Sequence, residues 1–265
     1  LDIYDEKAAK TQFLEQFEIL CKTHNSDPSA LQSLPTAYDY IRLGHPLSCV
    51  LEWALANLNQ LGPENTISFS SQTIPVLAIL RTNLSNGKNT QIVYTGALPD
   101  AFDTETLKQV YGYHFQLKQV ENTAAIPKFD GSTIYITEQK ELWTVEQSSN
   151  IDFYVQTNAA LGSVLLVNGH QNKSYISDIQ HVRRRETIAM TPANSLVALQ
   201  SLVENAPFEK IVTAVEANNA SVLRSVKEIT GSTTKAQVAS SGLSMQYAIM
   251  MGLIHDALEN HKGKA

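Results

Sequence analysis

The sequence predicts an α/β protein in which helices cover both faces of a mostly parallel β-sheet, a three-layer α-β-α arrangement. Two observations carry this prediction. Short apolar runs of strand length alternate with amphipathic stretches of helix length through the first two thirds of the chain. The composition, with 43% hydrophobic and 17% charged residues among 265, is that of a globular protein with one substantial core. Strands that alternate with helices favour parallel pairing with both faces of the sheet buried.

The N-terminal part is predicted to be mainly helical. Residues 5–22 carry apolar side chains at helical spacing. A stretch that contains proline and serine, 27–35, indicates a loop. A second amphipathic helix over 47–60 is expected to end where Gly62 and Pro63 follow, because neither residue continues a helix well.

The middle of the chain supplies the sheet. Its apolar runs are rich in β-branched and aromatic residues and are separated by polar or glycine-containing turns, which is typical of strands. Two stretches between them have helical periodicity. The expected strands are 66–69, 90–95, 116–120, 133–137, 151–156 and 164–168, and the expected helices are 72–84 and 103–111.

From about residue 175 the pattern becomes mainly helical, with helices expected over 175–188, 192–204, 207–228 and 244–260. We therefore divide the chain into three parts. Residues 1–46 form an N-terminal arm and helix, 47–190 a shortened α/β domain, and 191–265 a reduced C-terminal α+β domain.

Composition and charge exclude several classes of function. With a net charge of −6, a nucleic acid or an anionic membrane surface is not an expected partner. The run Arg183 to Arg185 is interpreted as a solvated helix face. No apolar run reaches the ~18 residues of a membrane-spanning helix, and the first residues lack the order of a signal peptide. Cys21 and Cys49 form neither a metal motif nor a disulfide framework, so we expect no metal site and a cytoplasmic location.

Residues 40–73 carry a specific pattern. Tyr40, Arg42 and Pro46 precede a helix with Leu51, Glu52, Leu55, Ala56 and Leu58, after which come Phe69, Ser70 and Ser71. This order resembles the cysteine/methionine-metabolism family of pyridoxal-phosphate enzymes, which includes cystathionine γ-synthase and lyase. Near the other end, Ser240, Gly242 and Leu243 followed by Leu253, Ile254, Asp256 and Leu258 resemble the closing segment of the same family.

The resemblance implies a shortened fold of the pyridoxal-phosphate transferase type and a set of cofactor-binding positions. Ser70 and Ser71 match the start of the phosphate cup, although Gln72 replaces the glycine that would let the phosphate approach. In the family, the residues that match Tyr40 and Arg42 reach the phosphate of the neighbouring subunit. Tyr111 matches the tyrosine that stacks on the cofactor ring, with packing in the core as the equal alternative.

The chemistry that should accompany these positions is missing. The lysine that would form the aldimine is replaced by Ala159, or by Asn158 in the other alignment. The segment that carries the ring carboxylate is too short, and we interpret Glu138 and Glu141 as exposed loop acids. Gln237 or Val238 stands where the family has the arginine that clamps the substrate.

Two histidines are weak candidates for an acid or base, His45 and His114. For each of them, a half-buried, hydrogen-bonded structural role is favoured.

The sequence therefore predicts a non-catalytic homologue that acts as a binding or partner subunit. It would form a homo-oligomer, or a hetero-oligomer with an active homologue, through residues 36–60, and no cofactor is expected. The alternative is an active pyridoxal-phosphate C–S lyase or γ-replacement transferase that uses a displaced Lys140, Lys173 or Lys235. A third hypothesis is a phosphate or carboxylate site in the pocket left by Arg42, Ser70, Ser71 and Tyr111.

Overall fold

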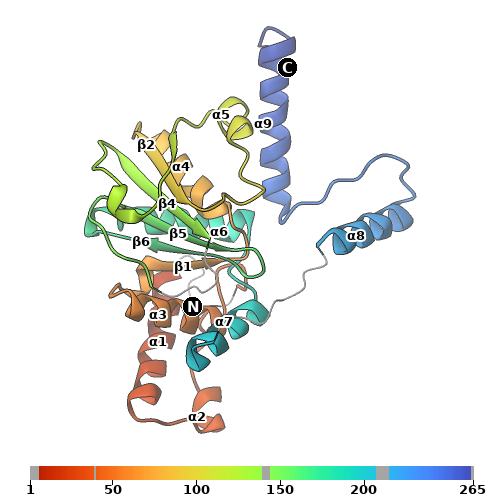
Figure 1. The fold of residues 1–265 in the computed structure, drawn as a ribbon. Helices are drawn as coiled ribbons and strands as arrows, with labels where there is room; N and C mark the ends of the chain where they lie inside the picture. Colours follow the sequence, from red (N-terminus) through yellow and green to blue (C-terminus); the bar gives the residue numbers. More distant parts are fainter. Residues whose placement is uncertain (1–5, 39, 139–143, 207–214, 264–265) are drawn as a thin grey trace.

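The computed structural model describes residues 6–38, 40–138, 144–206 and 215–263, and these residues build a layered α/β fold around one six-stranded sheet (Figure 1). The strand order is β1-β6-β5-β4-β2-β3. Both pairings of β6 are antiparallel and the other three are parallel, so five strands point one way and β6 points the other. The strands are β1 (Thr66–Phe69), β2 (Thr90–Thr95), β3 (Gln116–Gln119), β4 (Ser132–Glu138), β5 (Phe153–Asn158) and β6 (Gly162–Val167).

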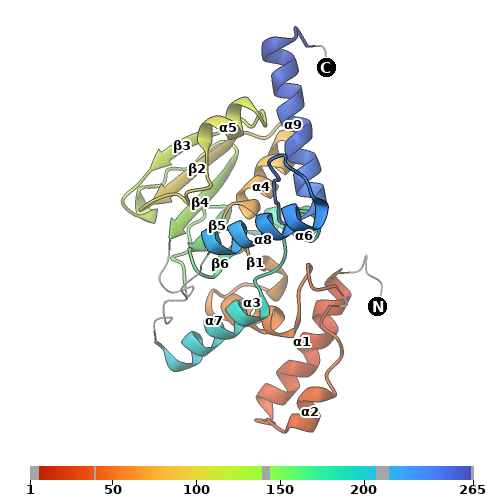
Figure 2. The same cartoon turned by 90° about the vertical axis from the view of Figure 1, so that its right-hand side faces the viewer.

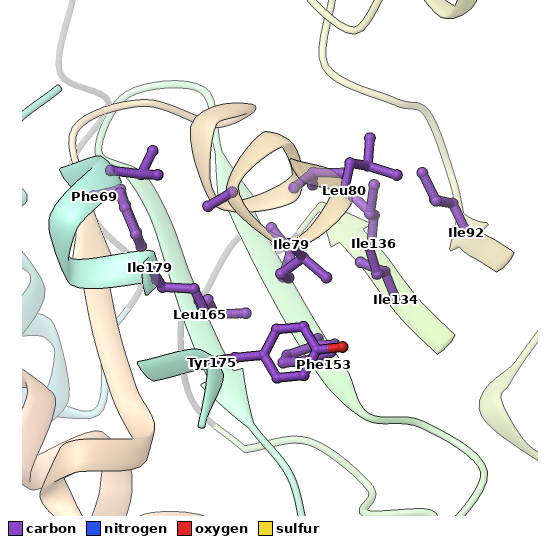
Figure 3. Packing of buried hydrophobic residues seen from close by; sticks show 14 of the residues in the cluster. Phe69, Ile79, Leu80, Ile92, Ile134, Ile136, Phe153, Leu165, Tyr175 and Ile179 are labelled. Carbon is purple, nitrogen blue, oxygen red and sulfur yellow. The ribbon is translucent and has the colours of Figure 1, made fainter. Parts of the chain in front are cut away.

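Helices cover both faces of this sheet, which confirms the predicted fold class. Side chains alternate along each strand, so Ile134 and Ile136 point to one face while Tyr135 points to the other. The first face packs on α4 (Ile74–Ser85) and α6 (Tyr175–Glu186), as the cluster in Figure 3 shows. The second face packs on α3 (Pro46–Leu58) and α7 (Pro192–Glu204).

The sheet closes without the strand that the resemblance would place between β4 and β5, because these two strands pair directly. β5 then turns back into β6 as a hairpin, in register from Phe153–Val167 to Asn158–Gly162. The ends of β1, β2, β4 and β5 lie along one side of the sheet, together with the beginning of β6. This side is called the carboxyl edge below, and the opposite side the amino edge.

The N-terminal helix α1 (Glu6–Lys22) packs on α3 through a small core of its own, which contains Phe13, Leu14 and Cys49. The predicted loop 27–35 was partly wrong, since it contains the short helix α2 (Pro28–Gln32). Asp27 accepts a hydrogen bond from the Ser29 amide and Pro28 occupies the first helical position, which is an ordinary start of a helix.

The remaining helices complete the chain. α5 (Thr104–Gln109) joins β2 to β3, and α8 (Val215–Thr230) and α9 (Gly242–Asn260) follow α7; single 3₁₀ turns are Pro63–Asn65, Thr123–Ala125 and His170–Asn172. Figure 1 shows α8 apart from the layered body, and Figures 1 and 2 both show α9 extending away from it. Ile229 on α8 and Leu253 and Leu258 on α9 are well exposed.

Within the described part of 191–265 the structure has helices and no strand, although the sequence indicated a mixture of both. The proposed division of the chain into three parts stays a prediction. None of the described helices is long and apolar enough to cross a bilayer.

Candidate functional site at the carboxyl edge

The segment 187–190, which follows α6, brings together residues that the sequence analysis took from two separate places. On one side of it, the Arg42 carbonyl accepts a hydrogen bond from the Ala189 amide at 3.0 Å. On the other side, the Ser70 amide donates to the Ile188 carbonyl at 3.1 Å. Arg42 and Ser70, to which the resemblance gives separate roles, are therefore neighbours within a single chain.

Tyr40 and Arg42 contact the end of α6. The Arg184 guanidinium lies 5.7 Å from the centre of the half-exposed Tyr40 ring. The Arg42 side chain donates a long hydrogen bond of 3.4 Å to the Arg185 carbonyl. Among the described residues no ion pair of Arg42 is found, so the alternative of a local salt bridge has no support here.

Ser71 uses the groups that a phosphate would need. Its hydroxyl oxygen accepts hydrogen bonds from the amides of Thr73 and Ile74, at 3.3 and 3.2 Å, at the start of α4. Helix N-termini bind anions through these amides. The Ser70 hydroxyl in turn lies 3.2 Å from the Thr187 hydroxyl. The hydroxyls of both serines and the amides of Thr73 and Ile74 therefore already have partners within the chain.

Ala159, in the predicted lysine position, lies exposed in the turn of the β5–β6 hairpin. The Asn158 side-chain oxygen accepts hydrogen bonds from the amides of Ala160 and Leu161, which fixes the turn. The Asn194 amide group donates to the carbonyls of Ala160 and Leu161. This position has a methyl group and cannot form a Schiff base.

Of the lysines considered as replacements, Lys173 lies away from this edge. Lys173 pairs with Glu64 at 3.2 Å, just before β1 and therefore at the amino edge. Lys235 is exposed in the connection between α8 and α9, and Lys140 lies outside the described residues. Among the other predicted positions, Glu138, Gln237 and Val238 are exposed and Glu141 lies outside the described residues.

His45 has a structural role. Its Nδ1 accepts a hydrogen bond from the Ser48 amide and so caps α3. Because Nδ1 accepts, Nε2 carries the proton, which it donates to the Met190 carbonyl at 2.8 Å. His114 is exposed. The structural, hydrogen-bonded role that the sequence favoured is therefore confirmed for His45. His114 is exposed and so is not the half-buried residue that was expected.

Tyr111 follows α5 and packs into a group of aromatic side chains. Its ring stacks on the Tyr113 ring, with 6.1 Å between the two ring centres. It also packs against the ring of Tyr247 of α9, with 5.5 Å between the ring centres. Arg81 covers the other ring of this group, 4.6 Å from the centre of Tyr247, and is paired with Glu186. Burial raises the pKa of both Tyr111 and Tyr247. Core packing, the alternative interpretation of Tyr111, describes these contacts.

Tyr247 attaches α9 to the body through Tyr111, Tyr113 and Arg81, so its removal should loosen that helix. We expect Tyr247→Ala to speed amide hydrogen exchange along α9 about tenfold, the factor that corresponds to roughly 1.4 kcal/mol. Met250→Ala, at a half-exposed position on the same helix, is the matched control and should leave the exchange unchanged. Equal exchange in the two variants would contradict this attachment.

A buried charge cluster around Glu52 was not predicted from the sequence. Glu52 is fully buried. Its carboxylate forms ion pairs with Lys10 Nζ at 2.6 Å and with Arg183 Nη1 at 2.7 Å. The amide and hydroxyl of Ser68 donate to the same carboxylate at 2.8 Å. Burial raises the pKa of Glu52, but Lys10 and Arg183 outweigh burial and lower it to about 2.

The interpretation of Arg183 as part of a solvated face was wrong, because its side chain is completely buried. Arg185 alone of the three is exposed. A signal was present in the sequence, since Glu52 lies on the apolar face of its helix between Leu51 and Leu55. A carboxylate there requires a cation to pair with it.

Taken together, the described residues of the carboxyl edge do not fit pyridoxal phosphate. The predicted lysine position holds Ala159, and the amides of the expected phosphate cup are bonded to Ser71 Oγ. Besides Arg42 and the exposed Glu138 at the end of β4, this edge offers neutral hydrogen bonding. The Thr95 hydroxyl, for example, lies 2.9 Å from Tyr135 Oη and 3.1 Å from Thr137 Oγ1. These groups can bind and orient a ligand but form no nucleophile–base pair.

No family model and no curated protein matches this chain. Solved structures similar to it include metB from Corynebacterium glutamicum, at 14% identity and a TM-score of 0.40, over 80% of this chain and 62% of that one. Cystathionine gamma synthase from Xanthomonas oryzae pv. oryzae, solved with cystathionine, has 14% identity and a TM-score of 0.40, over 77% and 61%.

A third similar structure is a putative O-acetylhomoserine (thiol)-lyase from Campylobacter jejuni, which contains N′-pyridoxyl-lysine-5′-monophosphate. Its identity is 13% and its TM-score 0.35, over 80% of this chain and 69% of that one. The chain spans about six tenths of the length of the first two structures.

Proposed function

We propose that this chain is a non-catalytic homologue of the transsulfuration-type pyridoxal-phosphate enzymes and acts as a binding or partner subunit in an oligomer. The observation that carries the proposal is the exposed hairpin turn at Ala159, where a catalytic lysine would be needed. An aldimine requires an amine that can exchange with the amine of the substrate. A methyl group at the end of a hairpin supplies none.

The position of Lys173 disfavours the alternative of an active lyase or transferase in which a displaced lysine forms the aldimine. The ion pair of Lys173 with Glu64 holds it at the amino edge, across the sheet from Ser70 and Ser71. Lys235 is exposed in the connection between α8 and α9, and no hydrogen bond or ion pair of its side chain is found within the described ranges. The alternative therefore depends on Lys140 or Lys235.

The partner surface is proposed to include the exposed part of residues 36–60. Much of this segment is buried within the chain, since Leu51, Leu55 and Ala56 are inaccessible to solvent. Tyr40 and Ile41 remain exposed, with 41% and 59% of their surface accessible. Neighbouring exposed apolar and aromatic side chains are a feature of contact surfaces between proteins.

Light scattering coupled to size-exclusion chromatography tests the proposal. We expect the protein alone to run as an oligomer, or to form a complex when an active homologue is added. Ile41→Asp should shift either species towards the monomer at micromolar concentration, because a charge would be buried in the contact. Val203→Asp, at an 86% exposed position of α7, is the control. A strict monomer that captures no homologue would contradict the proposal.

A further inference from the structure

A cavity of about 520 Å³ lies between α4, α6 and the beginning of α9. This volume is within the range of small-molecule sites. The apolar part of its lining comes from Ala78, Val182, Leu243 and Tyr247. None of the predicted cofactor-binding residues, all of which the structure describes, lines it. The cavity is therefore separate from the predicted cofactor positions.

Two of the charged side chains in this cavity neutralise each other. Arg81 of α4 donates hydrogen bonds to both carboxylate oxygens of Glu186 of α6. The Arg81 guanidinium also lies over the Tyr247 ring, 4.6 Å from the ring centre. Because these two charges already have partners, neither of them is the first contact that a charged ligand would make.

Arg185 of α6 has no such partner. Its side chain is exposed and lines the cavity, and within the described ranges it forms no hydrogen bond and no ion pair. A second cation lies at the same end of α6, since the Arg42 guanidinium donates to the Arg185 carbonyl. The end of the cavity beside α9 therefore carries positive charge that no ion pair of Arg185 or Arg42 among the described residues compensates.

Asp178 marks the opposite end of the cavity. Its exposed carboxylate accepts a long hydrogen bond of 3.5 Å from the Thr82 hydroxyl. Positions 178 and 185 are seven residues apart on one helix, roughly 10 Å along its axis. That is about one Debye length at 0.1 M salt, so Asp178 only weakly opposes an anion bound at Arg185. His181 lies between them on the same helix, is exposed, and can donate an N–H.

We propose that this cavity binds a small monocarboxylate with an apolar body, whose carboxylate pairs with the Arg185 guanidinium while the body packs on Val182, Leu243 and Tyr247. The planar fork of an arginine matches a carboxylate through two parallel N–H···O bonds. Leu243 is 44% exposed, so a ligand would also remove apolar protein surface from water. The site goes beyond the proposed subunit role and does not depend on it.

Isothermal titration calorimetry with phenylacetate, 2-phenylethanol and 2-phenylethylamine tests the proposal, because the three probes share an aromatic body and differ in charge. Phenylacetate should bind most tightly. The amine should bind at least tenfold more weakly, since it brings like charge to Arg185 and no acceptor for its N–H groups. If the amine bound as well as phenylacetate, or if phenylacetate did not bind at millimolar concentration, the proposal would be overturned.

Three variants locate the binding. Arg185→Gln should weaken phenylacetate about tenfold and leave 2-phenylethanol unchanged, with the same melting temperature as the wild type, because the side chain has no partner to lose. Asp178→Asn removes the acid at the other end and should not weaken phenylacetate. Arg224→Gln, the same substitution at an exposed position of α8, is the control. Phenylacetate affinity that is unchanged in Arg185→Gln, or that falls equally in Arg224→Gln, would refute the site.

Discussion

Replacing Glu52 by glutamine is expected to destabilise the protein by about 3–5 kcal/mol, because two buried cations then lose their counter-charge. Lys10 and Arg183 both direct their charge at this one carboxylate, and it is fully inaccessible to solvent. The amide of glutamine keeps the shape of the side chain but not its charge. Urea unfolding followed by circular dichroism measures the loss.

Two further variants make this result specific. Lys10→Met leaves Glu52 paired with Arg183 and should cost less than Glu52→Gln. Glu228→Gln on α8 removes an exposed acid and should change the free energy of unfolding by less than about 0.5 kcal/mol. If Glu52→Gln cost no more than Glu228→Gln, the cluster would not hold α1, α3 and α6 together.

The same cluster predicts how stability depends on pH. The pKa of Glu52 is lowered from 4.5 to about 2 in the folded protein, so its ionised form is stabilised by folding. This contribution is complete above the pKa of the unfolded chain and is lost as the pH falls through the folded pKa. The difference in unfolding free energy between the wild type and Glu52→Gln should be constant above about pH 5 and shrink towards about pH 2. A difference that stayed constant over this interval would contradict the assignment.

The second large effect is expected at Gly162, where alanine should cost about 3 kcal/mol or more. Gly162 has φ +115°, a conformation that L-residues rarely adopt, and it begins β6 where that strand pairs with β5. An added Cβ would overlap the Phe69 carbonyl oxygen and come within 2.9 Å of the Ser70 carbonyl. The hairpin and β1 would have to separate.

Gly87→Ala is the matched control for this prediction. Gly87 also has a positive φ, +62°, but no atom lies within 4 Å of its added Cβ. It should show only the backbone penalty, about 1 kcal/mol. Chemical denaturation of both variants separates the two contributions. Equal losses would mean that the close approach to Phe69 and Ser70 is unimportant.

The fold class and nearly all elements of regular structure were predictable because their patterns are local. The strands 66–69 and 90–95 are found with the predicted boundaries, since apolar β-branched runs end there at polar turns. The antiparallel direction of β6 was not predictable. Its turn at Ala159 lacks the Asn-Gly or Asp-Gly signal of a tight hairpin and is made instead by the Asn158 side chain.

The buried cluster was not predictable in full because its members are far apart in the chain. Arg183 lies next to two other arginines, a pattern that predicts an exposed helix face. Its partner Glu52 is 131 positions away in the sequence. The proximity of Arg42 and Ser70 likewise depends on the segment 187–190, which no sequence motif marks. The roles of Tyr40, Arg42, Ser70, Ser71 and Tyr111 stay predictions, since their positions agree with several functions.

The loss of aldimine chemistry is the central claim, and absorbance with borohydride reduction tests it most directly. The purified protein is scanned from about 300 to 500 nm with and without added pyridoxal phosphate, reduced, and analysed by peptide mass spectrometry. We expect no saturable band and only scattered, substoichiometric adducts on exposed lysines. A reducible yellow band with one pyridoxyl group per chain on a single lysine, Lys140 above all, would contradict it and restore the active enzyme.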